Sequence, residues 1–402
     1  MFIHHDQVSK KTNHKKKIKK KKHTMNQKYI LITEGTTQVY VFHTKTTNKG
    51  PASKNTQPFY NPTMQLNRDL SIVVNEYLLQ KAKKPFDILD GLAASGIRGI
   101  RYAKELNGSF TITINDSNKQ AFSLIKKNIA HNKIKNCIAS NQNIHTILSQ
   151  HHYDSIDIDP FGSPIYFFDS AMRSIRHNGM ISCTATDTAT LCGVYPTVCM
   201  RRYGARPLHS TPMHEIGLRI LLGCLCKEAA KYDKAIQPIL CYSTDHYMRI
   251  YIHIQSGKQQ ANNCMKHYGY IHPKDIILQP PKNKQPIGPL WLGPLHCKKA
   301  IQEIRTLLLT KELNTKNTIY QLLSLLEEES DASPFFYTTE DFAKHLEMFV
   351  PSKEKIFQQF KQKAYNISPT HFSTIGFKTN ASIKEIKQIF KEQKTSQECE
   401  QQ

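Results

Sequence analysis

The residues with the clearest chemical potential lie in the segment Tyr153–Pro164, whose sequence is YDSIDIDPFGSP. A pattern typical of a buried strand leads directly into Asp159, Pro160 and Phe161. Proline ends the strand because it has no N–H group to donate to a neighbouring strand. The segment therefore predicts a turn that presents a carboxylate, a carbonyl group and an aromatic ring at the end of a strand.

An exocyclic amine of a nucleobase needs these three groups to react as a nucleophile. Its lone pair is delocalised into the base, so two acceptors must hold its N–H groups and one acceptor must take a proton. The Asp159 carboxylate and the Pro160 carbonyl can be these acceptors, with Asp159 taking the proton. Phe161 can stack on the face of the base. The pattern favours methylation of such an amine, and the alternative is a tight turn with a helix-capping aspartate.

A second segment, Phe86–Arg101, predicts a buried strand, a turn of small residues and the start of a helix. The small residues from Gly91 to Gly96 allow the backbone to approach a ligand at the carboxyl end of the strand. The turn lacks the G-x-G-x-x-G pattern that binds a pyrophosphate, which favours S-adenosylmethionine as the ligand. Asp90 ends this strand, and Asp116 follows the next strand, where it can accept hydrogen bonds from a ribose. The alternative is a structural turn with a capping aspartate.

These segments belong to a pattern of alternating strands and helices, which predicts an α/β fold with a mostly parallel sheet. The predicted strands are Phe86–Asp90, Phe110–Asn115, Asp154–Asp159, Gly179–Thr184, Ile236–Thr244 and Tyr247–Gln255. The last two are expected to form an antiparallel pair that closes the sheet. Pro273–Pro289 is interpreted as a linker or long loop. Lys298–Glu329 and Ala381–Gln393 are predicted to be helical.

We predict four regions along the 402 residues. Residues 1–24 form a Lys-rich tail, 25–256 the catalytic domain, 257–393 a smaller α+β domain and 394–402 a second tail. Both tails are expected to be disordered. The first tail can bind RNA, act as a nuclear address or be an extension before Met25, and these alternatives stay open.

The charge of the chain favours a nucleic acid as its partner. The sequence has 55 Lys and Arg against 32 Asp and Glu, a formal net charge of +23. Nine of the positive charges lie in Lys10–His23, and the remainder is still basic. Neutralising phosphates releases condensed counterions, so a basic surface binds polyanions. No apolar run is long enough to span a membrane, and none of the ten cysteines forms the C-x-x-C pair of a zinc ribbon.

Several residues outside the two chemical segments are candidates for RNA contact. Arg201, Arg202 and Arg206 surround Tyr203, a combination that suits phosphate contact with stacking. Lys378 is a second candidate, with an ordinary solvated lysine as the alternative. Glu215 is interpreted as a helix-stabilising residue, and residues 335–337 as apolar core of the smaller domain.

Beyond these patterns, the chain resembles the tRNA (guanine-N2-)-dimethyltransferase family, which methylates the exocyclic N2 of a tRNA guanine, typically at position 26. The resemblance covers nearly everything from Ile32 onward. It is carried by Glu34–Gly35, Phe59–Ser71, Asp90–Tyr102, Asp157–Pro164, Thr184–Ala189, Leu191–Gly193, Arg202–Ala205, His214–Glu215, Asp245–Tyr247, Gly288–Gly293, Thr370–Phe372 and Gly376–Thr379. It implies a class I (Rossmann-like) methyltransferase domain and a C-terminal tRNA-binding domain.

The resemblance also implies roles for particular residues. Asp159 matches the catalytic aspartate of the family, and Arg98 and Asp116 match positions that contact the cofactor. Arg68 lies in an upstream motif that closes over the cofactor. Where relatives have an acid beside the adenine, this chain has Asn143, followed by Ile144. The segment Tyr268–Pro289 lacks the cysteine cluster of many relatives, so no metal is expected.

The sequence thus predicts an enzyme that adds one or two methyl groups from S-adenosylmethionine to a tRNA guanine. Two alternatives remain open. The first is an amino-methyltransferase that acts on another tRNA guanine or on another nucleic acid. The second is a non-catalytic RNA-binding protein that keeps the fold. A cytoplasmic location is expected, or a nuclear one in a eukaryote.

Overall fold

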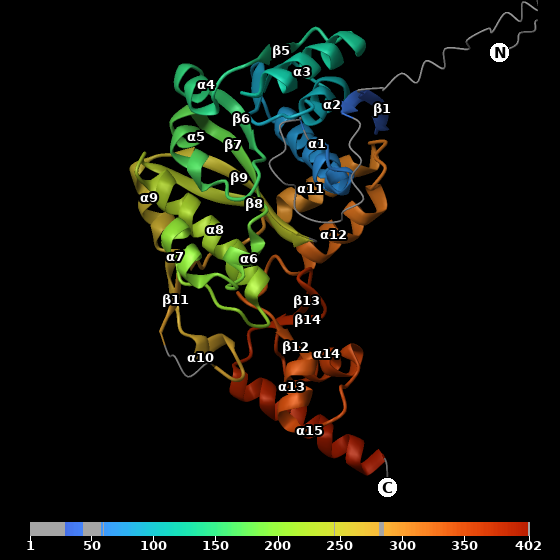
Figure 1. Cartoon of the computed structure of the whole chain (residues 1–402). Helices are drawn as coiled ribbons and strands as arrows, with labels where there is room; N and C mark the ends of the chain where they lie inside the picture. The colour runs from blue at the N-terminus through green and yellow to red at the C-terminus, as the bar shows by residue number, and fades with distance from the viewer. Residues whose placement is uncertain (1–28, 43–57, 59, 245, 281–284, 401–402) are drawn as a thin grey trace, which may run out of the picture.

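The computed structural model describes residues 29–42, 58, 60–244, 246–280 and 285–400. The predicted tail at residues 1–24 lies outside the described residues. A seven-stranded sheet forms the centre of the molecule, in the order β5-β4-β3-β6-β7-β9-β8 (Figure 1). Its strands are β3 (Phe86–Asp90), β4 (Phe110–Asn115), β5 (Cys137–Ser140), β6 (Tyr153–Ile158), β7 (Ile175–Ala185), β8 (Lys234–Thr244) and β9 (Tyr247–Ser256).

The sheet confirms the predicted α/β class. Strands β5, β4, β3, β6 and β7 are parallel, and β9 and β8 add an antiparallel pair at one edge. Sequence analysis missed β5, an edge strand of four residues in which Ile138 is 54% exposed. It also missed the separate antiparallel hairpin of β1 (Tyr29–Glu34) and β2 (Thr37–Phe42).

Helices cover both faces of the sheet, and each face has its own apolar core. The first core contains side chains of α1 (Gln65–Leu79), α2 (Ile97–Glu105), α3 (Lys119–His131), α11 (Lys298–Leu309) and α12 (Lys316–Glu328). The second contains side chains of α4 (Ile144–Gln150), α5 (Phe168–Ser174), α8 (Met213–Ala230) and α9 (Lys258–Met265). The predicted helical stretch Lys298–Glu329 is therefore two helices packed against one face of the seven-stranded sheet.

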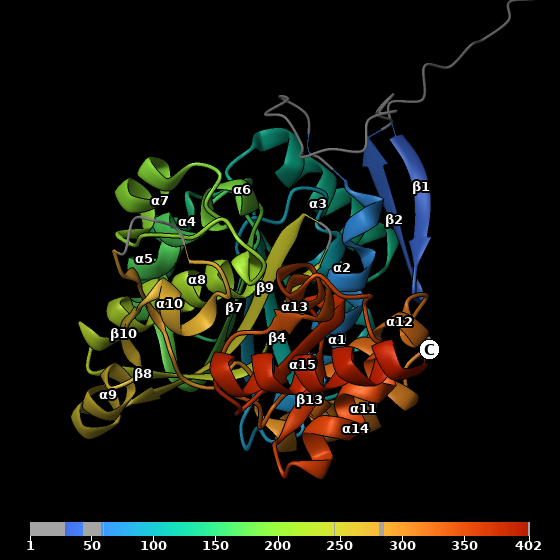
Figure 2. The same cartoon turned by 90° about the horizontal axis from the view of Figure 1, so that it is seen from below.

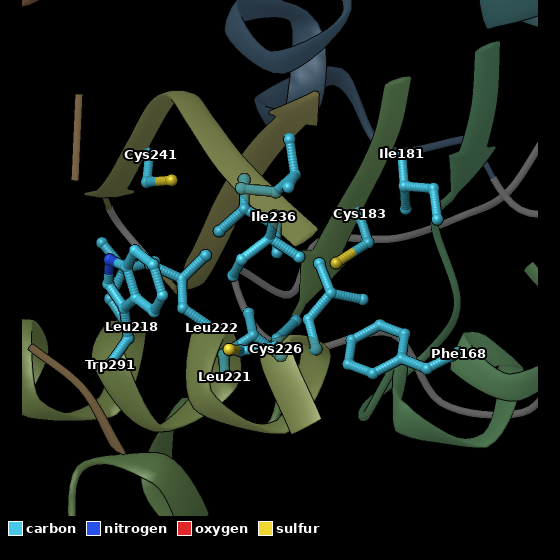
Figure 3. Close-up of a cluster of buried hydrophobic side chains, with 14 of the residues drawn as sticks. Phe168, Ile181, Cys183, Leu218, Leu221, Leu222, Cys226, Ile236, Cys241 and Trp291 are labelled. Carbon is cyan, nitrogen blue, oxygen red and sulfur yellow. The ribbon is translucent and has the colours of Figure 1, made fainter. Parts of the chain in front are cut away.

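Helix α8 lies at the centre of the second core. Its Leu218, Leu221 and Leu222 are fully buried, and Ile181 of β7 belongs to the same cluster (Figure 3). Trp291, in β11 (Ile287–Trp291), packs into this cluster as well. Strand β11 pairs with β10 (Tyr268–Ile271), so chain beyond the predicted boundary at residue 256 completes the core of the first domain.

The segment Pro273–Pro289, interpreted as a linker or loop, is partly regular structure. It contains the short helix α10 (Pro273–Ile276) and the beginning of β11. Among the described helices, none is long and apolar enough to cross a membrane.

A separate C-terminal body has its own small apolar core, which includes Phe342, Phe360, Phe377 and Phe390. It consists of β12 (Tyr337–Thr338), β13 (Ile367–Thr370), β14 (Ser373–Thr379), α13 (Thr339–Leu346), α14 (Lys353–Gln362) and α15 (Ile383–Glu400). The body lies at the bottom of Figure 1 and in front of the sheet in Figure 2. Helix α15 continues to Glu400, where a disordered tail from residue 394 was predicted, because neither glycine nor proline interrupts this stretch.

A buried charge network joins the C-terminal body to the domain of the seven-stranded sheet. Lys378 of β14 is 2% exposed, and its Nζ lies 3.1 Å from Glu215 Oε1 in α8 and 3.4 Å from Glu329 Oε2. Arg219 Nη2 also contacts Glu215, at 2.8 Å. The candidate role of Lys378 in RNA contact is therefore wrong, because its ammonium group is enclosed between two carboxylates. Glu215 lies in the first turn of α8, as its interpretation as a helix-stabilising residue requires, and its carboxylate also pairs with Lys378 and Arg219.

Two histidines complete this network. His371 contacts Glu329 through Nδ1, while its Nε2 accepts a hydrogen bond from the Ser243 N–H at 3.3 Å. His296 Nε2 lies 3.4 Å from Glu329 Oε1. Burial lowers the pKa of His296 to about 4, so this ring is neutral near neutral pH. Ligand atoms of both histidines and Glu329 lie within 4.8 Å of one another, but the nearby Lys378 ammonium opposes a cation at this place.

Replacing Lys378 by Met is expected to lower the free energy of unfolding by about 3–5 kcal/mol, because the buried Glu329 would lose its lysine partner and the buried Glu215 would keep only Arg219. Urea unfolding of the variant and the wild type measures this difference. The matched control is Lys384→Met, which changes an exposed lysine of α15 and should cost less than about 0.5 kcal/mol. Equal stabilities of the two variants would contradict the proposed importance of the network.

Candidate functional site

Three acidic residues meet at one edge of the sheet. Asp90 ends β3, Asp116 follows β4, and Asp159 follows β6. Strand β3 lies between β4 and β6, and all three run parallel. The carboxyl ends of parallel strands share an edge, so the two segments identified from sequence are brought together there. The Gly91 N–H donates to the Asp157 carbonyl at 3.1 Å and joins them directly.

The loop between Gly91 and Gly96 is held in an unusual backbone conformation. Ala94 and Gly96 have positive φ angles of 49° and 78°. The Ala94 N–H donates to Asp116 Oδ2 at 2.8 Å, and the Asn118 N–H donates to Asp116 Oδ1, also at 2.8 Å. The half-buried Asp116 carboxylate thus orders the loop, and it has further lone pairs with which to accept hydrogen bonds from a ligand.

Asn143 and Ile144 occupy different positions at the start of α4. Ile144 is 4% exposed, and a Cβ added at Gly91 would lie 2.6 Å from its Cδ1. Ile144 therefore packs next to the loop, and a side chain at position 91 would require this isoleucine to shift. Asn143 is exposed, and its Oδ1 accepts a hydrogen bond from the His145 N–H at 2.9 Å as the helix cap.

Arg98 links the loop of residues 91–96 to the turn that contains Asp159, Pro160 and Phe161, here named the Asp159 turn. Its Nη2 forms an ion pair with Asp159 Oδ2, and its Nη1 donates to Asn67 Oδ1 at 2.9 Å and to Ser71 Oγ at 2.8 Å. The side chain is 5% exposed. Burial acts to lower the pKa of Arg98, but the carboxylates of Asp157 and Asp159 raise it above its usual value. The guanidinium is therefore charged and fixed, with one oxygen of Asp159 as its partner.

A second buried arginine supports the first. Arg249 of β9 is fully buried, and its Nη1 donates to Asp157 Oδ1 at 3.1 Å and to Thr184 Oγ1 at 3.0 Å. Burial acts to raise the pKa of Asp157, but Arg249 and Arg98 lower it below its usual value. Asp157 is therefore ionised, and the two arginines and two aspartates form a connected network below the site.

Asp90 differs from the other acids at this edge. It is 2% exposed, and its Oδ2 accepts a hydrogen bond from the Gly99 N–H at 3.0 Å. Burial raises its pKa to about 7, with an opposing contribution from Arg98 and a further increase from Asp157. The Asp90 carboxyl group thus changes its protonation near neutral pH.

The Asp159 turn is held by hydrogen bonds from residues outside β6. The Gly162 N–H donates to Thr186 Oγ1 at 2.7 Å, and the Thr186 N–H donates to the Gly162 carbonyl at 2.9 Å. Ser163 Oγ lies 2.7 Å from the Tyr203 hydroxyl. Phe161 is 56% exposed at the tip of this turn, and Pro160 is half-buried.

Arg68 is not part of this group of contacts. Its Nε donates to Glu34 Oε2 at 2.8 Å, and its Nη2 donates to the Asn61 carbonyl at 3.1 Å. Burial acts to raise the pKa of Glu34, but Arg68 lowers it below its usual value. Arg68 thus holds the end of the β1 strand against α1, and its predicted contact with a cofactor stays a prediction.

The structure corrects the prediction that Tyr203 is a stacking residue in a basic loop. It also shows residues of the site that sequence analysis missed. Tyr203 is 5% exposed, so it braces the turn and is no stacking surface. Arg201 and Arg202 are exposed. Asn67, Ser71 and Arg249 were missed as site residues. The spacing of Asn67 and Ser71 places both on one face of α1, and an arginine inside the apolar β9 strand is a signal for Arg249.

Comparisons with known proteins connect this site to tRNA modification. Residues 35–391 match the family described as N2,N2-dimethylguanosine tRNA methyltransferase. The chain is 35% identical to the tRNA (guanine(26)-N(2))-dimethyltransferase of Methanobrevibacter smithii, with 83% of this chain and 91% of the relative covered. The enzyme of Pyrococcus furiosus is also 35% identical, with 89% and 97% covered. Trm1 from Pyrococcus horikoshii in complex with S-adenosyl-L-methionine has a similar structure, with a TM-score of 0.79, 32% identity, and coverage of 90% and 99%.

The raised pKa of Asp90 predicts a specific pH dependence of stability. The folded state binds the proton more tightly than the unfolded state, so this carboxyl destabilises the fold as pH rises from about 4 to about 7. The Asp90→Asn variant should therefore become more stable relative to wild type over this range, by up to about 4 kcal/mol. Denaturant unfolding at several pH values measures the difference. Asp87→Asn, on the same strand but half-exposed, is the control, and an equal gain there would contradict the assignment to Asp90.

Proposed function

Because the chain belongs to the family of N2,N2-dimethylguanosine tRNA methyltransferases, we propose that it methylates the exocyclic N2 of a tRNA guanine with S-adenosylmethionine as methyl donor, at position 26. The relatives named above carry this activity in their names. The observation that supports the proposal most strongly is the position of the Asp159 turn. It follows β6, the neighbour of β3, and the small-residue loop begins where β3 ends.

The loop suits a cofactor that lies directly against the backbone, because the residues from Gly91 to Gly96 are mostly small. In our proposal, Asp116 accepts hydrogen bonds from the ribose, and Asn143 and Ile144 lie beside the adenine. The methionine part of the cofactor carries an ammonium and a carboxylate group. The negative charge for the ammonium comes from Asp90, and the positive charges for the carboxylate come from Arg98 and Arg68. When bound, the cofactor supplies a methyl group that is already activated on a sulfonium.

Asp159 is proposed to orient the amine and accept its proton. Arg98 occupies Oδ2 of this carboxylate, and Oδ1 makes no hydrogen bond within the described part of the chain. Oδ1 can therefore accept one N–H of the guanine amine, while the Pro160 carbonyl accepts the other. Phe161, exposed at the tip of the turn, is proposed to stack on the guanine. Methylation leaves one N–H on the amine, which allows a second transfer.

The remaining proposals concern partners and location. The exposed lysines of the C-terminal body support its role in tRNA binding through phosphates. These are Lys355, Lys361, Lys363, Lys384 and Lys391. The activated methyl donor removes the need for a metal, and we propose that the reaction uses none. A cytoplasmic location, or a nuclear one in a eukaryote, fits a tRNA substrate.

Replacement of Asp159 by Asn is expected to lower the methylation rate by about 10²–10⁴-fold, because the proton acceptor is lost. Nucleoside mass spectrometry of unmodified tRNA transcripts incubated with enzyme and S-adenosylmethionine measures the product and the number of methyl groups. The control, Asp169→Asn, changes an exposed acid of α5 that is paired with Arg173. Full activity of Asp159→Asn, or no methylated guanosine from wild type, would refute the proposed function.

Replacement of Asp116 by Ala is expected to weaken S-adenosylmethionine binding by about 10–100-fold, because charged hydrogen bonds to the ribose and to the Ala94 N–H are both lost. Isothermal titration calorimetry measures the Kd. Asp169→Ala serves as the control again, and an unchanged Kd for Asp116→Ala would exclude this residue from the cofactor site.

A further inference from the structure

The segment that follows β7 exposes several large apolar side chains beside the Asp159 turn. Val194 and Tyr195 are 49% and 56% exposed, and Met200 is 44% exposed. Val194 and Tyr195 lie between α6 (Thr188–Leu191) and α7 (Pro196–Tyr203), and Met200 lies on α7. Large apolar side chains that are exposed close together on a protein surface often mark an interaction site.

Hydrogen bonds hold this segment against the Asp159 turn at both ends. At its start, Thr186 forms the two hydrogen bonds to Gly162 described above. At its end, the Tyr203 hydroxyl lies within hydrogen-bonding distance of Ser163 and donates to Asp187 Oδ1 at 2.7 Å. Since Asp187 also accepts from Arg202 Nη1 at 3.2 Å, the two ends of the segment meet. The hydrogen bonds therefore hold both ends of the segment next to the turn that carries Phe161.

The charge of this surface matches a polyanion. Arg201 and Arg202 are exposed next to Met200, and Arg206 follows them. Residues 186–210 contain one acid, Asp187, and that acid is already paired with Arg202. The excess of arginine over acidic residues favours a polyanion, such as a nucleic acid, over a protein partner of ordinary charge.

We propose that this surface binds the tRNA nucleotides that flank the target guanosine. The surface, named the α6–α7 surface, consists of Phe161, Val194, Tyr195, Met200, Arg201 and Arg202. The inference rests on the proposed function, because it names the part of the same substrate that lies beside the Asp159 turn. The N2 amine of a guanine in a stacked stem lies in the minor groove between neighbouring base pairs. The target base therefore has to leave the stack to reach Asp159.

Extrusion of the target exposes the flat faces of the neighbouring bases. Tyr195 and Met200 can cover these faces, as aromatic side chains do in proteins that bind unstacked bases. Arg201 and Arg202 can contact the phosphates on either side, which sets the register of the tRNA without reading its sequence. In this arrangement Phe161 stacks on the target base, while Tyr195 stacks on a base next to it.

The test uses the full chain and an unmodified tRNA transcript. The double variant Tyr195→Ala/Met200→Ala is expected to weaken tRNA binding by on the order of tenfold or more, as for the loss of one stacked base. Its Kd for S-adenosylmethionine should stay unchanged. Tyr195→Phe, which keeps the ring, should bind tRNA like wild type. Arg201→Gln should weaken tRNA binding and reduce the salt dependence of log Kd by a slope of about one.

The control variant is Tyr320→Ala, which removes a tyrosine that is 43% exposed on α12. Thermal unfolding of every variant shows whether the fold is retained. Unchanged tRNA affinity of a folded Tyr195→Ala/Met200→Ala variant overturns the proposal. Dissociation of a wild-type oligomer by the same variant, with tRNA affinity retained, assigns the surface to a second copy of the chain and also overturns it. Failure of the proposed function would appear separately, as wild-type enzyme that makes no N2-methylated guanosine.

Discussion

The interaction on which the site depends is the pairing of two buried arginines with two aspartates. Arg98 comes from α2, Arg249 from β9, and Asp157 and Asp159 from β6 and its following turn. A charged guanidinium out of contact with water is tolerated only when carboxylates and hydrogen-bond acceptors surround it. Elements that are distant in sequence must therefore meet in one register, or several charges remain buried without partners.

This requirement gives the antiparallel edge of the sheet a direct role in chemistry. Strands β8 and β9 extend a sheet whose other five strands are parallel, and the register of β7 with β9 places Thr184 opposite Arg249. Arg249 then reaches Asp157 and Thr184 together. The pairing leaves Arg98 available for Asp159, so the orientation of the proposed catalytic carboxylate depends on the packing of an entire hairpin.

A similar principle joins the two parts of the molecule. Glu215, Glu329 and Lys378 form a buried network whose members come from α8, the segment after α12, and β14. Buried ion pairs add little stability compared with apolar packing, but their geometry is specific. The network therefore defines how the C-terminal body sits relative to the sheet. With the proposed function, this arrangement fixes the distance between the proposed phosphate contacts on the body and the proposed catalytic Asp159.

The sequence by itself determined the class of fold, the strands that carry the acids, the small-residue loop and the Asp159 turn. These features depend on local residue types, such as proline ending a strand and glycine permitting close approach. The tertiary structure alone decided that Lys378 and Tyr203 are buried and that Arg98 holds Asp159. It also decided that Arg249 pairs with Asp157, which Arg98 contacts as well. Each of those outcomes depends on a partner far away in the chain, as the separation of 163 positions between Glu215 and Lys378 illustrates. Local patterns contain no information about which charges will share a buried space, because packing of the whole chain decides it.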